Sequence, residues 1–280
     1  MENIILSCGN SIPEIGFGVF MINDYEQCKK TVLNAIKCGY RHFDTAQVYQ
    51  NEQALGDAIK ESGVPREEFF ITTKLWCKSF SGTKAKAGIE RSLKRLGVKY
   101  IDLMLLHRPY SDYINAWKAL EDAVKEEKIK SIGISNFNRE QTEKILANGE
   151  IKPAVNQVEC HPYFQQHELR EFFAQNNMVM EAWYPLGHGD SGLLSEQVFK
   201  ELSQKYQKSV AQIILKWHIQ LGNIILPKSL NVNHMKENLC IYDFSLTEED
   251  MKKISLLNKN KSYYQTPEWL DHFIYRFLKD

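Results

Sequence analysis

Short apolar segments rich in β-branched residues alternate along the chain with segments whose apolar residues recur at helical spacing. In residues 25–39, Val32, Leu33 and Ile36 follow the helical period, and Gly39 marks a C-terminal end. The same periodicity recurs in residues 83–97, 113–128, 139–150 and 193–206. The apolar segments are EIGFG (14–18), RHFD (41–44), FFITTK (69–74), IDLMLL (101–106), IKSIGI (129–134), AVNQV (154–158), MVMEAW (178–183) and NIIL (223–226). This alternation predicts parallel strands connected by helices.

The number of strand–helix units and the length of the chain limit the possible folds. Eight strands alternating with helices in 280 residues fit an α/β fold, the (β/α)8 TIM barrel. No Pro-, Gly- or Ser-rich linker interrupts the chain, so residues 1–280 are expected to form one domain. A doubly wound open sheet is the alternative. Residues 4–18 predict a small N-terminal β-hairpin that turns at Gly9-Asn10 and covers the bottom of the barrel.

Composition and charge narrow the class of protein. Hydrophobic residues make up 43% and charged residues 25%, as in a soluble globular chain with a full core. The net charge is zero, which argues against a nucleic-acid partner, and no apolar run approaches the roughly 18 residues of a membrane span. The N-terminus lacks the features of a signal peptide, and the six scattered cysteines are expected to be reduced thiols. We therefore expect a cytoplasmic protein.

Chemically active side chains follow three successive strands. Asp44 ends RHFD, Lys74 ends FFITTK, and His107 follows IDLMLL, while Tyr49 lies in the loop after the first of these strands. In a barrel of this kind the C-terminal strand ends meet at one face, where catalytic residues lie. A charge at the end of one strand means little. Three in succession, with a tyrosine beside the first, predict a catalytic cluster.

A glycine-rich segment imitates a nucleotide-binding motif. Gly187-His188-Gly189-Asp190-Ser191-Gly192 matches GxGxxG. A dinucleotide fingerprint should open an early βαβ unit and be followed by a strand ending in an acid, and neither condition holds here. We expect instead a flexible loop after the seventh strand, which could fold over a cofactor because glycine lets the backbone approach closely.

The cysteines and histidines predict neither a nucleophile–base pair nor a metal site. Cys160 and His161 are adjacent, and neighbours in a strand point to opposite faces, so they are not expected to act as nucleophile and base. The histidines at 42, 107, 161 and 167 show no HExxH or Cys/His ligand spacing, so no metal site is expected.

Several segments together make the chain resemble the aldo-keto reductase family over nearly its whole length. They are GYRHFDTAQVYQNEQALG (39–56), LLHRP (105–109), IGISNF (132–137), VNQVECHP (155–162), EAWYPLG (181–187) and ILPKSLNVNHMKEN (225–238). The resemblance implies a (β/α)8 barrel that binds a nicotinamide cofactor without a Rossmann domain. It implies NADPH-dependent reduction of an aldehyde or ketone, a C-terminal loop that shapes the pocket, and a monomer.

The resemblance assigns a catalytic tetrad to Asp44, Tyr49, Lys74 and His107. Tyr49 would give a proton to the carbonyl oxygen as general acid. A free phenol has a pKa near ~10, and the ammonium of Lys74 is expected to lower it. Asp44 would keep Lys74 charged and positioned, and His107 would orient the carbonyl oxygen and donate a hydrogen bond to its developing charge.

The resemblance also implies which residues hold the cofactor. Ser135, Asn136 and Gln157 would bind the nicotinamide carboxamide, and Trp183 would stack on the ring. The loop of Pro185, Leu186, Gly187 and Gly189 would pass over the pyrophosphate. The adenosine end would meet Lys228, Ser229, His234, Glu237 and Asn238, with Lys228 and Ser229 at the 2′-phosphate.

The segment ILPKSLNVNHMKEN (225–238) departs from the family at two positions. An arginine is usual where His234 stands, and Asn231 replaces a basic residue of some relatives. A guanidinium stays charged and forks onto phosphate, whereas a free imidazole is mostly neutral at pH 7. Losing one charge-assisted bond of about 1.5–3 kcal/mol costs roughly tenfold or more in preference for NADPH. We expect NADPH to be favoured and NADH to be used appreciably as well.

The resemblance places Phe20, Trp76, His107 and Arg108 around the substrate, with Trp269 or Phe273 as further candidates from the tail. Phe20 and Trp76 suggest an apolar mouth suited to aldehydes. Arg108 stands where many relatives carry tryptophan or glutamine and could attract carboxylated or phosphorylated substrates. The alternative is that Arg108 points to solvent or pairs with Asp112.

Two other functions compete with the reductase. One is a cofactor-binding regulatory subunit with little turnover, against which the intact tetrad argues. The other is a barrel hydrolase or isomerase that uses Asp44 and His107 without a nicotinamide. Tight NADPH binding would exclude the second alternative, and turnover would exclude the first.

Overall fold

A ring of eight parallel strands forms the centre of the molecule. The computed structural model describes residues 2–264. Its strands are β3 (Phe17–Gly18), β4 (His42–Asp44), β5 (Phe70–Leu75), β6 (Ile101–Leu106), β7 (Ile129–Ser135), β8 (Val155–Glu159), β9 (Val179–Trp183) and β10 (Ile224–Ile225), each paired with its neighbour in the chain. A parallel bridge between Ile15 and Ile225 closes the ring. The (β/α)8 barrel and all eight predicted strands are confirmed.

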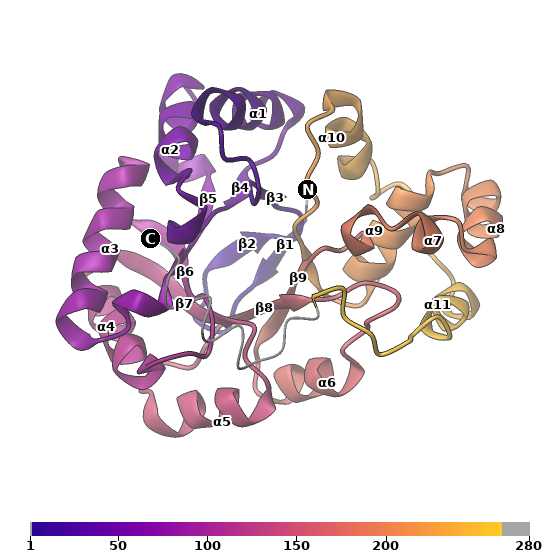
Figure 1. Ribbon diagram of the computed structural model, residues 1–280. Helices are drawn as coiled ribbons and strands as arrows, with labels where there is room; N and C mark the ends of the chain where they lie inside the picture. The colour runs from indigo at the N-terminus through magenta and orange to yellow at the C-terminus, as the bar shows by residue number, and fades with distance from the viewer. Residues whose placement is uncertain (1, 265–280) are drawn as a thin grey trace.

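The helices surround this ring on the outside (Figure 1). They are α1 (Tyr25–Cys38), α2 (Glu52–Glu61), α3 (Gly82–Leu96), α4 (Tyr113–Lys125), α5 (Arg139–Asn148), α6 (His167–Gln175), α7 (Ser191–Leu194), α8 (Gln197–Tyr206), α9 (Val210–Gln220), α10 (Val232–Leu239) and α11 (Glu248–Ser255). Gly39 ends α1 with a φ of 109°, which a side chain would strain. The helical pattern over 193–206 is divided into α7 and α8, because the backbone is extended at Glu196.

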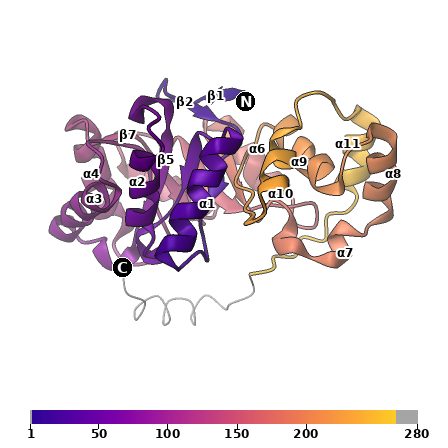
Figure 2. The same cartoon turned by 90° about the horizontal axis from the view of Figure 1, so that it is seen from above.

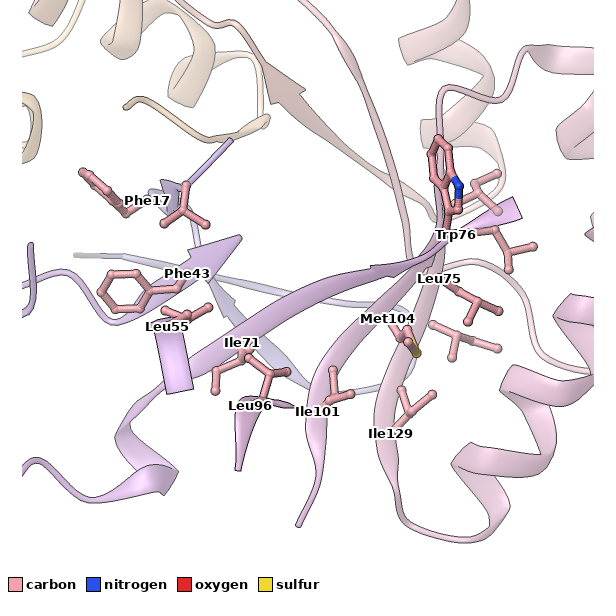
Figure 3. Close-up of a cluster of buried hydrophobic side chains, with 14 of the residues drawn as sticks. Phe17, Phe43, Leu55, Ile71, Leu75, Trp76, Leu96, Ile101, Met104 and Ile129 are labelled. Atoms are coloured by element: carbon pink, nitrogen blue, oxygen red, sulfur yellow. The ribbon is translucent and has the colours of Figure 1, made fainter. Parts of the chain in front are cut away.

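Apolar side chains fill the layer between the strands and the helices. Figure 3 shows strand residues such as Phe43, Ile71 and Met104 together with Leu55 of α2 and Leu96 of α3. All five side chains are buried. At roughly 25 cal/mol per Å² of apolar area removed from water, this layer supplies most of the force that keeps the strand ends in place.

The N-terminal hairpin closes one end of the barrel, as predicted. Its strands are β1 (Asn3–Ile5) and β2 (Ser11–Pro13), and Ile12 is buried against Phe70, the first residue of β5. The Asn10 side-chain amide donates to Ser131 Oγ near the start of β7, at 2.9 Å. Figure 2 shows the hairpin at one edge of the molecule and α7 toward the other. The C-terminal strand ends are therefore left for chemistry.

Within residues 2–264, the structure contains no helix with the length and apolarity needed to cross a membrane.

Candidate active site

A buried ion pair joins the ends of β4 and β5. Lys74 Nζ donates to both carboxylate oxygens of Asp44, at 2.7 Å each, and to the carbonyl oxygen of Thr45 at 2.9 Å. Lys74 is fully buried and Asp44 nearly so. Burial alone would lower the pKa of Lys74, but the charge of Asp44, its hydrogen bond and the other acidic groups around the lysine together outweigh burial, and the pKa is raised. Lys74 is therefore a fixed ammonium.

Tyr49 lies directly above this ion pair. It belongs to the short 3₁₀ helix η1 (Gln47–Tyr49), and Lys74 Nζ lies 5.0 Å from the centre of its ring. The rings of His107 and Phe20 approach the Tyr49 ring to 5.6 and 4.9 Å between centroids. The structure thus brings all four residues of the predicted tetrad to one end of the barrel.

The acidity of Tyr49 differs from the sequence-based expectation. Burial of the phenol raises its pKa to about 12, and the charge of Lys74 only partly opposes that effect. The sequence-based expectation of a lowered pKa took account of the Lys74 ammonium but not of the burial of the Tyr49 phenol. Lys74 still makes the phenol more acidic than burial alone would leave it, and Tyr49 is protonated at neutral pH.

His107 follows β6 and is neutral. Burial holds the pKa of its imidazole well below the usual value, and the charges of Lys74 and Arg108 lower it further. The ring packs edge-on against Trp76, 5.2 Å away. Its buried Nδ1 has no hydrogen-bond partner among the described residues. A neutral imidazole here can donate one hydrogen bond without bringing a positive charge.

The residues predicted to hold the nicotinamide lie at the ends of β7, β8 and β9. Asn136 donates to Ser135 Oγ at 2.8 Å and to the carbonyl oxygen of His107 at 3.2 Å, and its own carbonyl accepts from Trp183 Nε1 at 2.9 Å. Its φ of 62° is unusual for a residue other than glycine. Backbone strain of this kind persists where surrounding contacts over-determine it, often at functional sites. Ser135, Asn136 and Trp183 thus form one connected rim.

Gln157 binds two carboxyl groups at once. Its amide nitrogen donates to Asp44 Oδ2 at 2.8 Å and to Glu181 Oε2 at 2.7 Å. Glu181 is a buried residue of β9 for which the sequence suggested no role. The available signal was an acid within the apolar segment MVMEAW. With both amide protons engaged, only the carbonyl oxygen of Gln157 is left to accept from a ligand.

The GxGxxG segment forms a tight turn and is no nucleotide-binding motif of the Rossmann kind. Gly187–Gly189 make the 3₁₀ helix η4 after β9, the seventh barrel strand, and Pro185 and Leu186 precede it. Gly187 has a φ of 60°, and a Cβ there would lie 2.5 Å from Leu193. Tyr263 holds this turn through a 2.5 Å hydrogen bond to Asp190 Oδ2.

The predicted adenosine residues lie after β10 and on α10. Lys228 is exposed at the surface and donates to the carbonyl oxygen of Phe20 at 3.0 Å, and Ser229 accepts from the backbone of Asn231 at 3.1 Å. His234 is exposed on α10, Glu237 is half-buried and Asn238 is buried. Asn231 caps α10 by accepting from Asn233 N at 2.9 Å, which explains an asparagine at this position.

Some of the predicted substrate residues lie around the tetrad. Phe20 is 42% exposed and packs beside Tyr49, and Trp76 is fully buried against His107. Arg108 places its guanidinium 4.7 Å from the ring centre of Tyr264, and its charge lowers the pKa values of His107 and Tyr49. Asp112 accepts from Asn115 as the cap of α4. Trp269 and Phe273 lie outside the described residues.

The adjacent Cys160 and His161 do not form a catalytic pair. Burial raises the pKa of the Cys160 thiol to about 12, and His161 Nε2 is 3.1 Å from Glu159 Oε1. Groups of three or more histidine, cysteine or acidic side chains that could hold a metal ion are absent from residues 2–264.

Comparison with known proteins agrees with this geometry. A family model described as "Aldo/keto reductase family" matches residues 14–259. The chain belongs to the aldo-keto reductase family. It is 43% identical to a glyoxal reductase of Bacillus subtilis over 96% of this chain and 97% of the relative. It is 44% identical to a 9,11-endoperoxide prostaglandin H2 reductase of Trypanosoma cruzi over 92% of each chain.

Two solved structures share the fold closely. The aldo-keto reductase of Brucella melitensis superposes with a TM-score of 0.88 at 40% identity, covering 92% of this chain and 99% of the other. An aldo-keto reductase of Bombyx mori, solved in complex with NADP, superposes with a TM-score of 0.91 at 34% identity and covers 97% of both chains. The protein is therefore an oxidoreductase of the carbonyl-reducing type.

Proposed function

We propose that this protein reduces an aldehyde or ketone to the alcohol with NADPH, and that Tyr49 is the general acid. One observation carries the proposal. A phenol that stays protonated at neutral pH lies over a buried ammonium, beside a neutral imidazole, at the end of the barrel where catalytic residues collect. The names of the B. subtilis and Bombyx mori relatives support the same reaction and cofactor.

The residues have separate tasks in this reaction. Bound NADPH supplies the hydride to the carbonyl carbon. His107 donates a hydrogen bond to the carbonyl oxygen, and Tyr49 transfers its phenolic proton to that oxygen as negative charge develops. Lys74 stabilises the resulting phenolate, since its ammonium is already fixed by Asp44. Solvent then reprotonates Tyr49.

The groups around the rim fit a nicotinamide. Gln157 offers a carbonyl oxygen to the amide protons of the carboxamide. Ser135 Oγ donates to the backbone carbonyl of Gln157 and accepts from Asn136, so it has a lone pair left for the same protons. The indole of Trp183 is held by its bond to Asn136 and would stack on the nicotinamide. Lys228 and Ser229 are assigned to the 2′-phosphate, which favours NADPH. With His234 in place of arginine, NADH is used as well.

The substrate is expected to be a small carbonyl compound. The glyoxal reductase of B. subtilis and the methylglyoxal reductase of Salmonella typhimurium, 36% identical, suggest α-dicarbonyls. Arg108 would add a preference for substrates that carry a carboxylate or phosphate near the carbonyl group.

The test replaces the phenol by a phenyl ring. Tyr49→Phe should lower kcat for glyoxal or methylglyoxal by roughly 10²–10⁴-fold, the usual contribution of a general acid, while NADPH binding followed by fluorescence is retained. Tyr25→Phe, an exposed tyrosine of α1 bonded to Asp57, is the matched control and should leave kcat unchanged. Equal activity of Tyr49→Phe and wild type would refute the assignment. Tight NADPH binding by a wild type without turnover would favour the regulatory subunit.

A further inference from the structure

Glu181 is a buried acid that the proposed mechanism does not use. It lies in the middle of β9, is fully buried, and is paired in register with Gln157 of β8 and Ile224 of β10. The titratable and charged groups that face it are His42 and Asp44 from β4 and Lys74 from β5. Through the Gln157 amide it is linked to the carboxylate that holds Lys74.

The hydrogen bonds of His42 show how Glu181 must be protonated. His42 Nδ1 lies 3.2 Å from the carbonyl oxygen of Pro13, which can only accept, so Nδ1 carries a proton. Burial lowers the pKa of His42 to about 3, so its other nitrogen, Nε2, carries no proton and accepts from the hydroxyl of Thr72 at 3.1 Å. Nε2 lies 3.6 Å from Glu181 Oε1, too far for a charge-assisted bond between imidazolium and carboxylate.

Glu181 Oε1 thus faces a nitrogen that carries no proton, and no hydrogen-bond donor from the described residues reaches it. A carboxylate oxygen in that position would be ionised, buried and unpaired, which is far more costly than a neutral hydroxyl. Oε2 accepts from Gln157, as the carbonyl oxygen of a protonated acid would. These surroundings favour a neutral carboxylic acid over a carboxylate.

The charges of the cluster lead to the same protonation state. Asp44 and Lys74 already neutralise one another, so an ionised Glu181 would leave one unpaired negative charge in the barrel. Burial and then the charge of Asp44 raise the pKa of Glu181 to about 8. Glu181 is thus neutral at pH 7 and ionises in the mildly alkaline range.

We propose that Glu181 is a positioning residue that must remain a neutral carboxylic acid, and that its ionisation limits carbonyl reduction at alkaline pH. As a neutral acid it fixes Gln157 against Asp44. As a carboxylate it adds a second negative charge near Lys74 and cancels part of the field that makes Tyr49 acidic. The inference rests on the proposed role of Tyr49, but the protonation of Glu181 can be tested without it.

The kinetic test uses Glu181→Gln, which has the same shape but cannot ionise. Its amide oxygen can accept from Gln157, as Glu181 Oε2 does. With saturating NADPH and carbonyl substrate, wild-type kcat should fall up to tenfold per pH unit above about pH 8. The variant should stay within about threefold of wild type at pH 7 and keep its rate to at least one pH unit higher. Parallel pH profiles of variant and wild type would overturn the proposal.

The second test measures thermal unfolding and needs no turnover. Because the pKa of Glu181 is raised on folding, its contribution to stability is present at low pH and is lost as pH rises toward 8. The Tm of Glu181→Gln minus that of wild type should therefore become more positive between pH 5 and pH 8. Glu159→Gln is the control, since Glu159 on β8 has a lowered pKa and its Tm difference should stay constant over this range.

A third measurement uses the wild-type protein alone, in case the variant does not fold. The infrared spectrum should contain the carbonyl stretch of a buried protonated acid at pH 7, and this band should disappear by pH 10. Glu52 is a second buried carboxyl with a raised pKa, so the band is read in Glu52→Gln as well, where it should persist. Absence of the band at pH 7 would show that Glu181 is ionised and would overturn the proposal. If the band and the Tm trend are found while wild type and Tyr49→Phe turn over equally, the proton on Glu181 stands, and the role of Tyr49 together with the kinetic part of the inference fails.

Discussion

At the scale of single residues, the site depends on one lysine whose protons are all used. Lys74 has two carboxylate acceptors and one backbone acceptor. Ordinary burial would favour a neutral amine, but here the ammonium is held in a fixed direction and its charge acts on the phenol above it. The ammonium and Asp44 therefore depend on one another, for stability as well as for chemistry.

Removing one partner of the Lys74–Asp44 pair should lower the free energy of unfolding more than removing both. Lys74→Met leaves the Asp44 carboxylate buried and unpaired, which should cost about 3–5 kcal/mol of unfolding free energy. The double variant Asp44→Asn/Lys74→Met should be more stable than Lys74→Met, because no unpaired charge remains. Urea denaturation at pH 7 of both single variants and the double variant provides the cycle. Simple additivity of the two losses would contradict this account. Both variants that lack Lys74 should also reduce carbonyls poorly.

At the scale of elements, the barrel positions the tetrad, and we expect the surface helix α10 to set cofactor preference. The tetrad is borne by strand ends and by η1, which the packed core makes rigid. The groups assigned to the adenosine end lie instead on the segment after β10 and on the short helix α10. Asn231 is used there as a helix cap, and His234 lies one turn further on the exposed surface. Substitutions on α10 should therefore change cofactor preference without altering the rate of the chemical step.

His234→Arg should raise the preference for NADPH over NADH by about tenfold, the value of one added charge-assisted bond. The ratio of kcat/KM for the two cofactors measures this, and kcat with NADPH should stay within about twofold. Asn233→Arg adds the same charge to an exposed neighbouring position of α10 and serves as control. An equal rise in both variants would mean that the net charge of the helix acts, and not the side chain at 234.

At the scale of the whole molecule, stability and chemistry are divided between the two ends of the barrel. The hairpin of β1 and β2 seals one end with the apolar side chains of Leu6 and Ile12. The opposite end carries the tetrad, the turn of η4 and the residues around Tyr263 that hold that turn. A change at the sealed end should thus alter unfolding and leave catalysis intact.

Ile12→Ala tests this division. Ile12 is fully buried, so the cavity left by alanine should cost about 2–5 kcal/mol of unfolding free energy. Ile5→Ala is the matched control in the same hairpin, because Ile5 is 68% exposed and its loss should change stability by no more than about 0.5 kcal/mol. At 25 °C the kcat of both variants should equal that of wild type. A lower kcat for folded Ile12→Ala would show that the two ends are coupled.

The sequence by itself determined the eight strands, the hairpin and the cluster of Asp44, Tyr49, Lys74 and His107. These follow from local periodicity and from the rule that the C-terminal ends of parallel strands meet at one face. The late position of the GxGxxG segment, with no strand ending in an acid after it, likewise argued against a Rossmann motif.

Only the tertiary structure decided the protonation states of the buried groups in the site. The link from Glu181 through Gln157 to Asp44 depends on the register of strands that are far apart in the chain. The pKa of Tyr49 is set by burial that no local pattern shows, which is why the expectation of a lowered value was wrong. Periodicity fixes which side chains point inward, but the protonation of a buried group depends on every charge and hydrogen bond around it.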